Sequence, residues 1–191
     1  MKHPSTRGFF AYWDQMRGLA AAPERSALEP EPVRRLLGDS FVLAYEPKQG
    51  HPFRVTGTRV CALLGGDMKG QAFIRLWNDA SRTEIEDILA IAADEIIATV
   101  AGVTAQAGAA AAYLEMLLLP FSARPHTPVT IAGVLAPLRM PPRLGREGLT
   151  DLTLSSWRHV GHRELTARQR AIRKWKAARG IIVYEGLRGD V

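Results

Sequence analysis

Apolar residues recur at helical spacing close to the start of the chain. Phe9, Trp13 and Met16 are separated by four and three positions within residues 7–20, which places them on one face of a helix. The segment that follows is rich in proline and charged residues, a composition typical of a linker and of a short helix that begins with proline. We therefore expect residues 1–37 to form an N-terminal helical cap and linker that packs outside the main core.

The middle of the chain alternates between strand-like and helix-like segments. Residues 40–46 and 52–58 alternate apolar and polar positions and predict a hairpin. Short helices are expected next, followed by a longer helix that starts at Ser81, because Glu84 three residues later completes a capping box. The apolar stripe predicted for this helix consists of Ile85, Ile88, Leu89 and Ala92.

Three more apolar segments follow the longer helix. Residues 95–104 and 128–136 predict strands, whereas residues 110–119 fit a strand or a helix on their pattern alone. Three consecutive strands with short connections form an antiparallel meander. The predicted fold class is therefore α+β, with a five-stranded antiparallel sheet over residues 38–138 and helices on one face of that sheet.

The distribution of charge separates the end of the chain from its middle. The chain has 191 residues and a formal net charge of +6. Residues 38–138 carry seven basic and ten acidic groups, a net charge of −3, whereas residues 139–191 carry twelve basic and five acidic groups, a net charge of +7. We therefore expect any anionic partner to bind the basic C-terminal extension formed by residues 139–191.

Two further features of the sequence bear on location. No apolar run reaches the roughly 18 residues that a membrane span needs, and no charged segment followed by an apolar stretch marks a secretory signal. Cys61 is the single cysteine, which excludes an intrachain disulfide and a zinc site built from cysteines. We therefore expect a cytoplasmic protein without a membrane span.

Several short motifs occur in the order that one bacterial family shows. They include a tryptophan, an Arg-Gly pair, a strand that ends in Gly-Thr, a glycine-rich turn and a Leu-Leu-Pro sequence. Their positions are Trp13, Arg17-Gly18, Pro23, Arg25, Glu29-Pro30, Arg54 to Thr58, Gly65-Gly66, Gly70 and Leu118-Leu119-Pro120. Over residues 10–138 the chain resembles the alphaproteobacterial PAS domain family, long described as a domain of unknown function. The resemblance implies a PAS fold with an N-terminal helical cap and a role in signal transduction, without a defined ligand or reaction.

A PAS domain holds its ligand between the sheet and the helices, so the resemblance directs attention to that layer. The candidates for a small-molecule pocket are Phe53, Cys61, Phe73, Trp77 and Tyr113. The aromatic side chains either line a cavity or simply fill the core, and the filled core is the simpler interpretation. Cys61 lacks the arginine and glutamine that accompany the flavin-reactive cysteine of light-sensing relatives, which favours a small buried apolar residue.

The residue pattern offers no support for catalysis or for a cofactor. His51 and His126 fall in predicted loops, the other three histidines fall outside the predicted core, and no set has the spacing of metal ligands. Residues 65–70 are rich in glycine but lack the ending of a phosphate-binding loop, and no nucleophile elbow occurs. We therefore predict no catalytic residue, no metal site and no cofactor, so the purified protein should show no flavin or haem absorption.

In the C-terminal extension, cations surround a narrow apolar stripe. Residues 163–179 predict a helix with Leu165, Ile172 and Trp175 along one side. Such a helix suits contact with a nucleic acid or an anionic membrane surface. A run of charge is usually a solvated face, which favours docking of the stripe onto protein while the charges stay in water. The candidates for contact with a partner or an anion are Arg168, Arg170, Arg173, Lys174 and Lys176.

Together these features favour a PAS-type sensory or protein-interaction module of bacterial signalling without a catalytic step. PAS relatives dimerise through N-terminal helices, so the resemblance makes Phe9, Trp13 and Met16 candidates for a homodimer interface. A signalling protein and a small-molecule ligand are further expected partners. The alternative function is a nucleic-acid-binding regulator that acts through the basic C-terminal helix.

Overall fold

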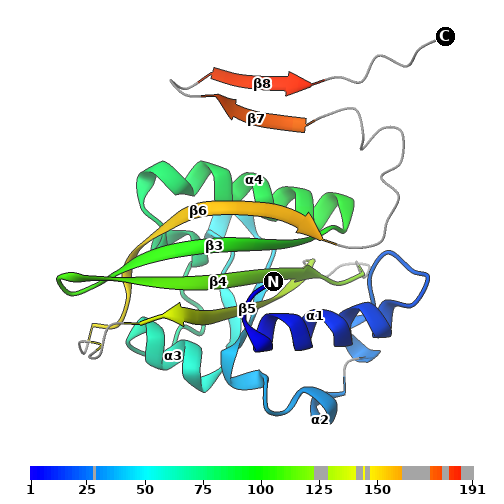
Figure 1. The fold of residues 1–191 in the computed structure, drawn as a ribbon. Coiled ribbons are helices and arrows are strands. Elements are labelled where there is room, and N and C mark those ends of the chain that lie inside the picture. The colour runs from blue at the N-terminus through cyan, green and yellow to red at the C-terminus, as the bar shows by residue number, and fades with distance from the viewer. Residues whose placement is uncertain are drawn as a thin grey trace. The chain divides into compact units, whose positions relative to one another are not determined.

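The computed structural model describes residues 1–27, 29–122, 129–140, 144, 147–160, 173–177 and 181–185. The chain divides into two units, Met1–Gly161 and His162–Val191. The first unit is an α+β structure built on an antiparallel sheet, as the sequence predicts, and Figure 1 shows its long strands running side by side. The second unit contains a two-stranded hairpin.

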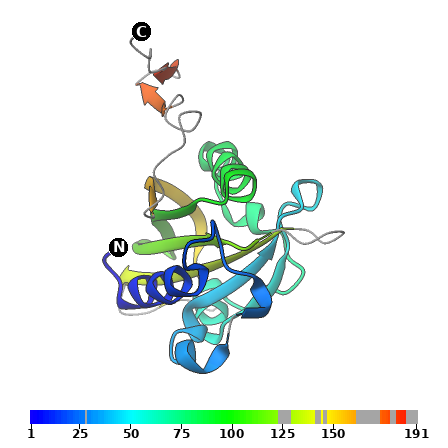
Figure 2. The ribbon, with the colours of Figure 1, turned by 90° about the vertical axis from the view of Figure 1, so that its right-hand side faces the viewer.

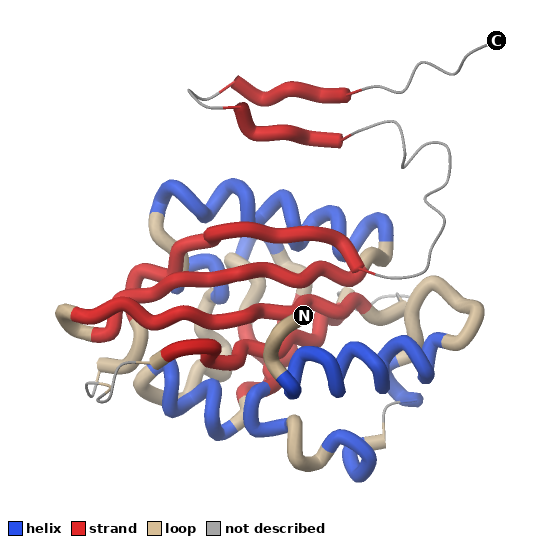
Figure 3. The backbone as a smooth tube through the Cα atoms, in the orientation of Figure 1, coloured by secondary structure: helices blue, strands red, loops and turns tan. Residues whose placement is uncertain are grey.

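The sheet of the first unit has six strands in the order β2-β1-β5-β4-β3-β6. Every pair of neighbours is antiparallel, and β3, β4 and β5 form the predicted meander. Residues 110–119, whose pattern fits a strand or a helix, lie in a strand (Figure 3). The bounds are β1 Ser40–Ala44, β2 Phe53–Thr56, β3 Ala98–Ala107, β4 Ala110–Pro120, β5 Thr130–Arg139 and β6 Thr150–Val160.

Two α-helices cover one face of this sheet, which we call the inner face. Helix α3 spans Thr58–Leu64 and α4 spans Asp79–Glu95, with the 3-10 helix η4 (Phe73–Leu76) between them. The predicted stripe of α4 is buried against the sheet, so the 3.6-residue period identified the correct face. Its members are Ile85, Ile88, Leu89 and Ala92.

The opposite, outer face carries the N-terminal helix α1 (Pro4–Arg17), with the short helix α2 (Pro30–Val33) beside it. Phe9 and Trp13 of α1 pack with side chains that alternate along β4 and β5, such as Leu117 and Val134. Figure 2 shows α1 and α4 on opposite sides of the sheet. The N-terminal helix was predicted as a cap outside the main core, and the structure shows that it covers the outer face of β4 and β5, which is itself apolar and needs a cover.

The sixth strand corrects the predicted count of five. Residues 150–160 were assigned to the C-terminal extension, but they pair along β3 within the first unit. A register shift opposite Gly102 and Val103 interrupts the alternation of β6, so Leu154 and Trp157 stand three positions apart instead of two. The apolar positions of β6 therefore do not follow the simple alternation that predicts a strand.

The start of α4 also differs from its prediction. The N-cap is Asn78, whose side chain accepts a hydrogen bond from the Ser81 N–H at 3.0 Å. The hydroxyl of Ser81 instead accepts the N–H of Leu154 in β6 at 3.0 Å, and the Asn78 N–H donates to the carbonyl of Leu152. Ser81 therefore ties the helix to an edge strand that the sequence did not predict.

In the second unit, the described residues form strand β7 (Arg173–Ala177) and strand β8 (Ile181–Glu185). The helix predicted over residues 163–179 is therefore wrong for 173–177, and its remaining residues lie outside the described part of the chain. The run Ile181 to Tyr184 is rich in β-branched and aromatic residues, and it pairs with β7 so that Trp175 faces Val183. The helix prediction did not consider residues 181–185 as a partner, and their pairing with 173–177 favours a hairpin.

Candidate functional site

Four aromatic side chains from different elements meet on the inner face. Phe41 from β1, Phe53 from β2, Phe73 from η4 and Trp77 are each at most 2% exposed. Ring centroids lie 5.6 Å apart for each pair of the three phenylalanines, and 5.7 Å apart for Phe73 and Trp77. Such stacked and edge-to-face contacts are characteristic of a filled core.

A glycine opposite Phe41 makes room for this cluster. Gly133 in β5 is the register partner of Phe41, and a Cβ built there would lie 2.1 Å from the Phe41 ring. Any side chain at position 133 would displace the ring. The aromatic cluster thus depends on a backbone position as well as on its own residues.

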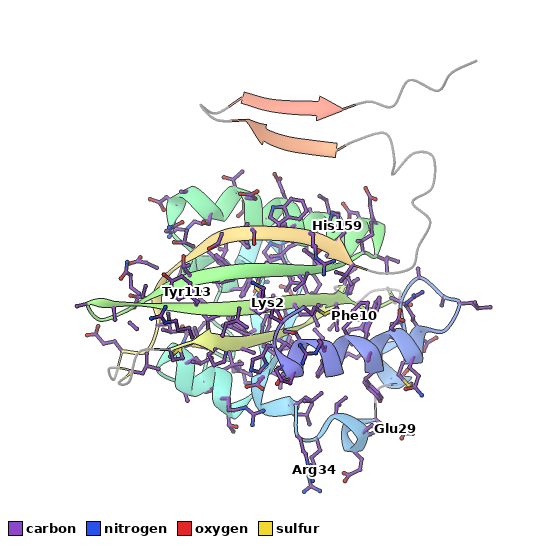
Figure 4. The ribbon with its side chains drawn as sticks, viewed as in Figure 1. Lys2, Phe10, Glu29, Arg34, Tyr113 and His159 are labelled. Atoms are coloured by element: carbon purple, nitrogen blue, oxygen red, sulfur yellow. The ribbon has the colours of Figure 1, made fainter. Side chains whose placement is uncertain are left out.

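The structure brings together three of the five predicted pocket residues. Phe53, Phe73 and Trp77 share the aromatic cluster, whereas Tyr113 is 45% exposed (Figure 4). Tyr113 is in phase with Leu117 on the outer face of β4, because successive strand residues point to opposite faces. Cys61 is half-buried on α3, and its thiol makes only a long contact, 3.8 Å, with the carbonyl of Thr56.

Three buried side-chain atoms of the inner layer lack a hydrogen-bond partner among the described residues: His51 Nδ1, Thr56 Oγ1 and Trp77 Nε1. Trp13 and Trp157 differ from Trp77 in this respect. Trp13 Nε1 donates to the Pro120 carbonyl and Trp157 Nε1 donates to Glu84 Oε1, both at 2.9 Å. Buried polar groups are normally paired, so the Trp77 indole N–H is an exception that needs an explanation.

His51 lies in the turn before β2, where the sequence predicts a loop, but its side chain is buried. It is 2% exposed, its ring stacks on Tyr45 at 5.0 Å, and its backbone is left-handed with φ of 58°. Burial lowers the pKa of His51, which keeps the ring neutral near pH 7. His159 on β6 is half-buried, and burial lowers its pKa more than the charge of Glu95 raises it.

On the outer face, a buried carboxylate of β4 holds the first turn of α1. Glu115, 6% exposed, accepts the backbone N–H groups of Lys2 and His3 at 2.6–2.9 Å and the hydroxyl of Thr6. Burial raises the pKa of Glu115, but these hydrogen bonds together lower it below its ordinary value. The ionised carboxylate therefore satisfies donors that a helix start leaves free.

A second buried carboxylate lies next to the same turn. Asp39, 4% exposed, accepts the Ser5 hydroxyl at 2.6 Å and the Arg59 guanidinium at 2.6 Å from Nε and 2.9 Å from Nη2. Burial raises the pKa of Asp39. The hydrogen bonds from Arg59 and Ser5, together with the charge of Arg59, lower it by more, so the net shift is downward. Neither carboxylate was predicted from the sequence, although Glu115, an acid within the apolar run of β4, was a signal of a buried, paired charge.

The predicted dimer residues serve a different purpose in the structure. Phe9 and Trp13 are 4% and 2% exposed within a single chain, because they dock α1 onto its own sheet. Met16 is half-buried, and Phe10 is partly exposed beside Trp13 (Figure 4). Phe9 and Trp13 therefore offer no free surface to a second copy.

Three of the five predicted anion-binding residues lie in the described part of the chain. Arg173, Lys174 and Lys176 lie in β7, whereas Arg168 and Arg170 lie outside the described residues. Within the described ranges, no group of three or more His, Cys, Asp or Glu side chains could hold a metal ion. None of the described helices is long and apolar enough to cross a membrane.

Comparison with known proteins agrees with this architecture. A family model described as PAS domain matches residues 1–136, a segment that includes α1, both carboxylate anchors and the aromatic cluster. No curated protein and no solved structure matches the chain significantly. The match covers more than half of the sequence, and the chain belongs to the PAS domain family.

Proposed function

We propose that this protein is a PAS-type sensory or protein-interaction module of bacterial signalling that performs no chemical step. The observation that carries the sensory part is the indole N–H of Trp77, which is buried between the inner face and its helices and has no acceptor within the described part of the chain. An unpaired buried donor costs about 1–3 kcal/mol. A ligand that supplies an acceptor would recover this cost.

The chemistry around Trp77 suggests the kind of ligand. Its neighbours are aromatic and aliphatic, with Phe73 at 5.7 Å between ring centroids. A small, mainly apolar molecule with one acceptor oxygen or nitrogen fits these surroundings. Because the rings are closely packed, binding requires a change of side-chain conformation in the cluster, and this change is the proposed signal.

The tryptophan side chains provide the test. In ¹⁵N-labelled protein, the indole N–H resonance of Trp77 is followed during titration with small carboxylic acids, amides and ketones. A saturable downfield shift of Trp77 is expected for a ligand, while Trp13 and Trp157, which already have acceptors, serve as internal controls. If no compound shifts Trp77 more than these two, the sensory proposal fails.

Helix α1 is the proposed output element. A signal in the inner layer would shift the equilibrium between a docked and a released α1, and release would expose the apolar outer face to a signalling protein. We also propose a cytoplasmic homodimer, as the family membership suggests. Because Phe9 and Trp13 are buried in one chain, such a dimer would use other residues in the docked state.

A second candidate function rests on charge. Residues 162–191 carry eight basic and three acidic groups, which favours an anionic partner such as a nucleic acid. Binding of duplex DNA or RNA would fall steeply with salt, and replacing Arg173, Lys174 and Lys176 by Gln would weaken binding and flatten that dependence. Binding that is insensitive to salt, or unchanged by the triple replacement, would remove this candidate.

A further inference from the structure

Three side chains form a continuous polar connection from α1 to α3. The Ser5 hydroxyl of α1 donates to Asp39 Oδ2 at 2.6 Å, and Arg59 of α3 donates to both oxygens of the same carboxylate. Arg59 Nη2 also donates to the carbonyl of Arg35 at 2.9 Å. Asp39 ends the 3-10 helix η2 (Leu37–Asp39), so it lies between the two helices in sequence and in contact.

The two helices belong to different layers of the protein. Val60, Leu63 and Leu64 of α3 are buried in the inner core with Phe73 and Trp77. By contrast, the apolar residues of α1 belong to the outer cluster. The connection through Asp39 therefore joins the layer that contains the proposed ligand site to the helix proposed as output.

Close backbone packing makes η2 and the start of α3 move together. A Cβ built on Gly57 would lie 2.1 Å from the carbonyl oxygen of Leu37, and one on Gly38 would lie 2.8 Å from Arg59 Cζ. The Gly57 N–H also donates to the carbonyl of Ser40 at 2.8 Å. A displacement of α3 consequently changes the position of Asp39, since no free space separates the two segments.

The second carboxylate that holds α1, Glu115, has no such connection to α3 among the contacts described above. Glu115 lies on β4, which is paired along its length with β3 and β5. A central strand is a fixed support, so the Glu115 anchor holds α1 irrespective of α3. Only the Asp39 anchor has a partner, Arg59, that belongs to a helix of the inner layer.

We infer that Arg59 and Asp39 couple the position of α3 in the inner layer to the docking of the first turn of α1 on the outer face. The inference deepens the proposed function, on which it rests for the role of α1 as output. Coupling is reciprocal, so loosening α1 at Ser5 should loosen α3. The part of this effect that passes through the Arg59 side chain should be lost when that side chain is replaced.

Amide hydrogen exchange of the full chain tests this coupling without a ligand. Four proteins are compared: wild type, Ser5→Ala, Arg59→Gln and the double variant. Ser5→Ala is expected to raise exchange in α1 and, at least fivefold, in α3, a change at the lower end of typical coupling. In the Arg59→Gln background, Ser5→Ala should change exchange in α3 clearly less than it does in the wild-type background.

Controls separate coupling from general loss of structure. Exchange in β4 must stay constant, and Arg54→Gln, which removes an exposed arginine paired with Glu46, should change neither helix. If Arg59→Gln does not fold, because Asp39 is left buried without its cation, the pair Asp39→Asn with Arg59→Gln replaces it as background.

Two results would overturn the inference: a Ser5→Ala effect confined to α1, or an equal effect on α3 in both backgrounds. The Trp77 titration is independent of this outcome. Absence of a ligand shift with intact coupling rejects the sensory proposal alone, whereas a ligand shift without coupling rejects the connection alone.

Discussion

The two faces of the sheet are stabilised by different physical means. The inner face buries aromatic rings that contact one another from several directions, and burial of this kind depends on area and not on orientation. The outer face combines a smaller apolar contact with hydrogen bonds to two buried carboxylates, Asp39 and Glu115. Charge-assisted hydrogen bonds require a defined geometry and a defined protonation state. The docking of α1 thus depends on geometry and protonation state, whereas the inner layer depends mainly on the apolar area that it buries.

The largest expected effect is loss of an inner aromatic ring. Phe73→Ala removes a side chain that contacts Phe41, Phe53 and Trp77, and it should lower the free energy of unfolding by about 3–5 kcal/mol. Phe10→Ala, at a partly exposed ring on α1, is the matched control with a much smaller loss. Urea denaturation gives both values. Equal losses would contradict the contrast between the two faces.

Removing the outer anchor should have a smaller and local effect. Glu115→Ala leaves the N–H groups of Lys2 and His3 without an acceptor, at a cost of about 2 kcal/mol for hydrogen bonds to a charged group. Limited proteolysis should then cut within α1 while the sheet stays intact. Glu86→Ala, at an exposed acid of α4, should leave the cleavage pattern unchanged. Protection of α1 in Glu115→Ala would show that apolar packing alone holds the helix.

The two faces should also respond to pH in different ranges. His51 has a lowered pKa in the folded protein, so it contributes stability that is complete above its ordinary value of 6.5 and is lost as the pH falls below it. One such histidine changes stability by at most about 1.4 kcal/mol per pH unit. Glu115, also with a lowered folded pKa, contributes stability that is lost only as the pH falls below its ordinary value of 4.5.

Unfolding measured at pH 7.5 and 5.5 separates these contributions. Wild-type protein should lose stability over this interval, and His51→Asn should lose less, because asparagine cannot be protonated and tolerates the left-handed backbone at this position. A residual slope is expected from His159, whose pKa is also lowered. The same slope in wild type and His51→Asn would show that His51 does not carry the effect.

The sequence predicted some elements well because a single chain segment carries their signal. The stripe of α4 and the shared face of Phe9 and Trp13 follow from helical periodicity, and both are confirmed as buried faces. Periodicity does not show which surface such a helix face packs against. Phe9 and Trp13 therefore suggested a dimer, although the partner is the sheet of the same chain.

Other features depend on contacts between distant segments. The bulge in β6 is defined by its pairing with β3, and the phase of Tyr113 is defined by the register of β4, so neither is visible locally. The anchor at Glu115 joins residues more than a hundred positions apart. Its one local sign is an acidic residue in an otherwise apolar strand.

The smallest expected effect on stability comes from an ion pair that lies at the surface and belongs to neither of the two buried layers. Arg54 of β2 and Glu46 form an ion pair whose arginine side chain is 52% exposed. Water and salt screen such a pair, so Arg54→Gln should change the free energy of unfolding by less than about 1 kcal/mol. The Arg59 side chain is similarly exposed at 55%, but the side chain of its partner Asp39 is only 5% exposed, and Arg59→Gln leaves that carboxylate buried with fewer donors. Urea denaturation of the two variants should therefore give a clearly larger loss for Arg59→Gln, and equal losses would mean that burial of the acid does not distinguish the outer anchor from an ordinary surface pair.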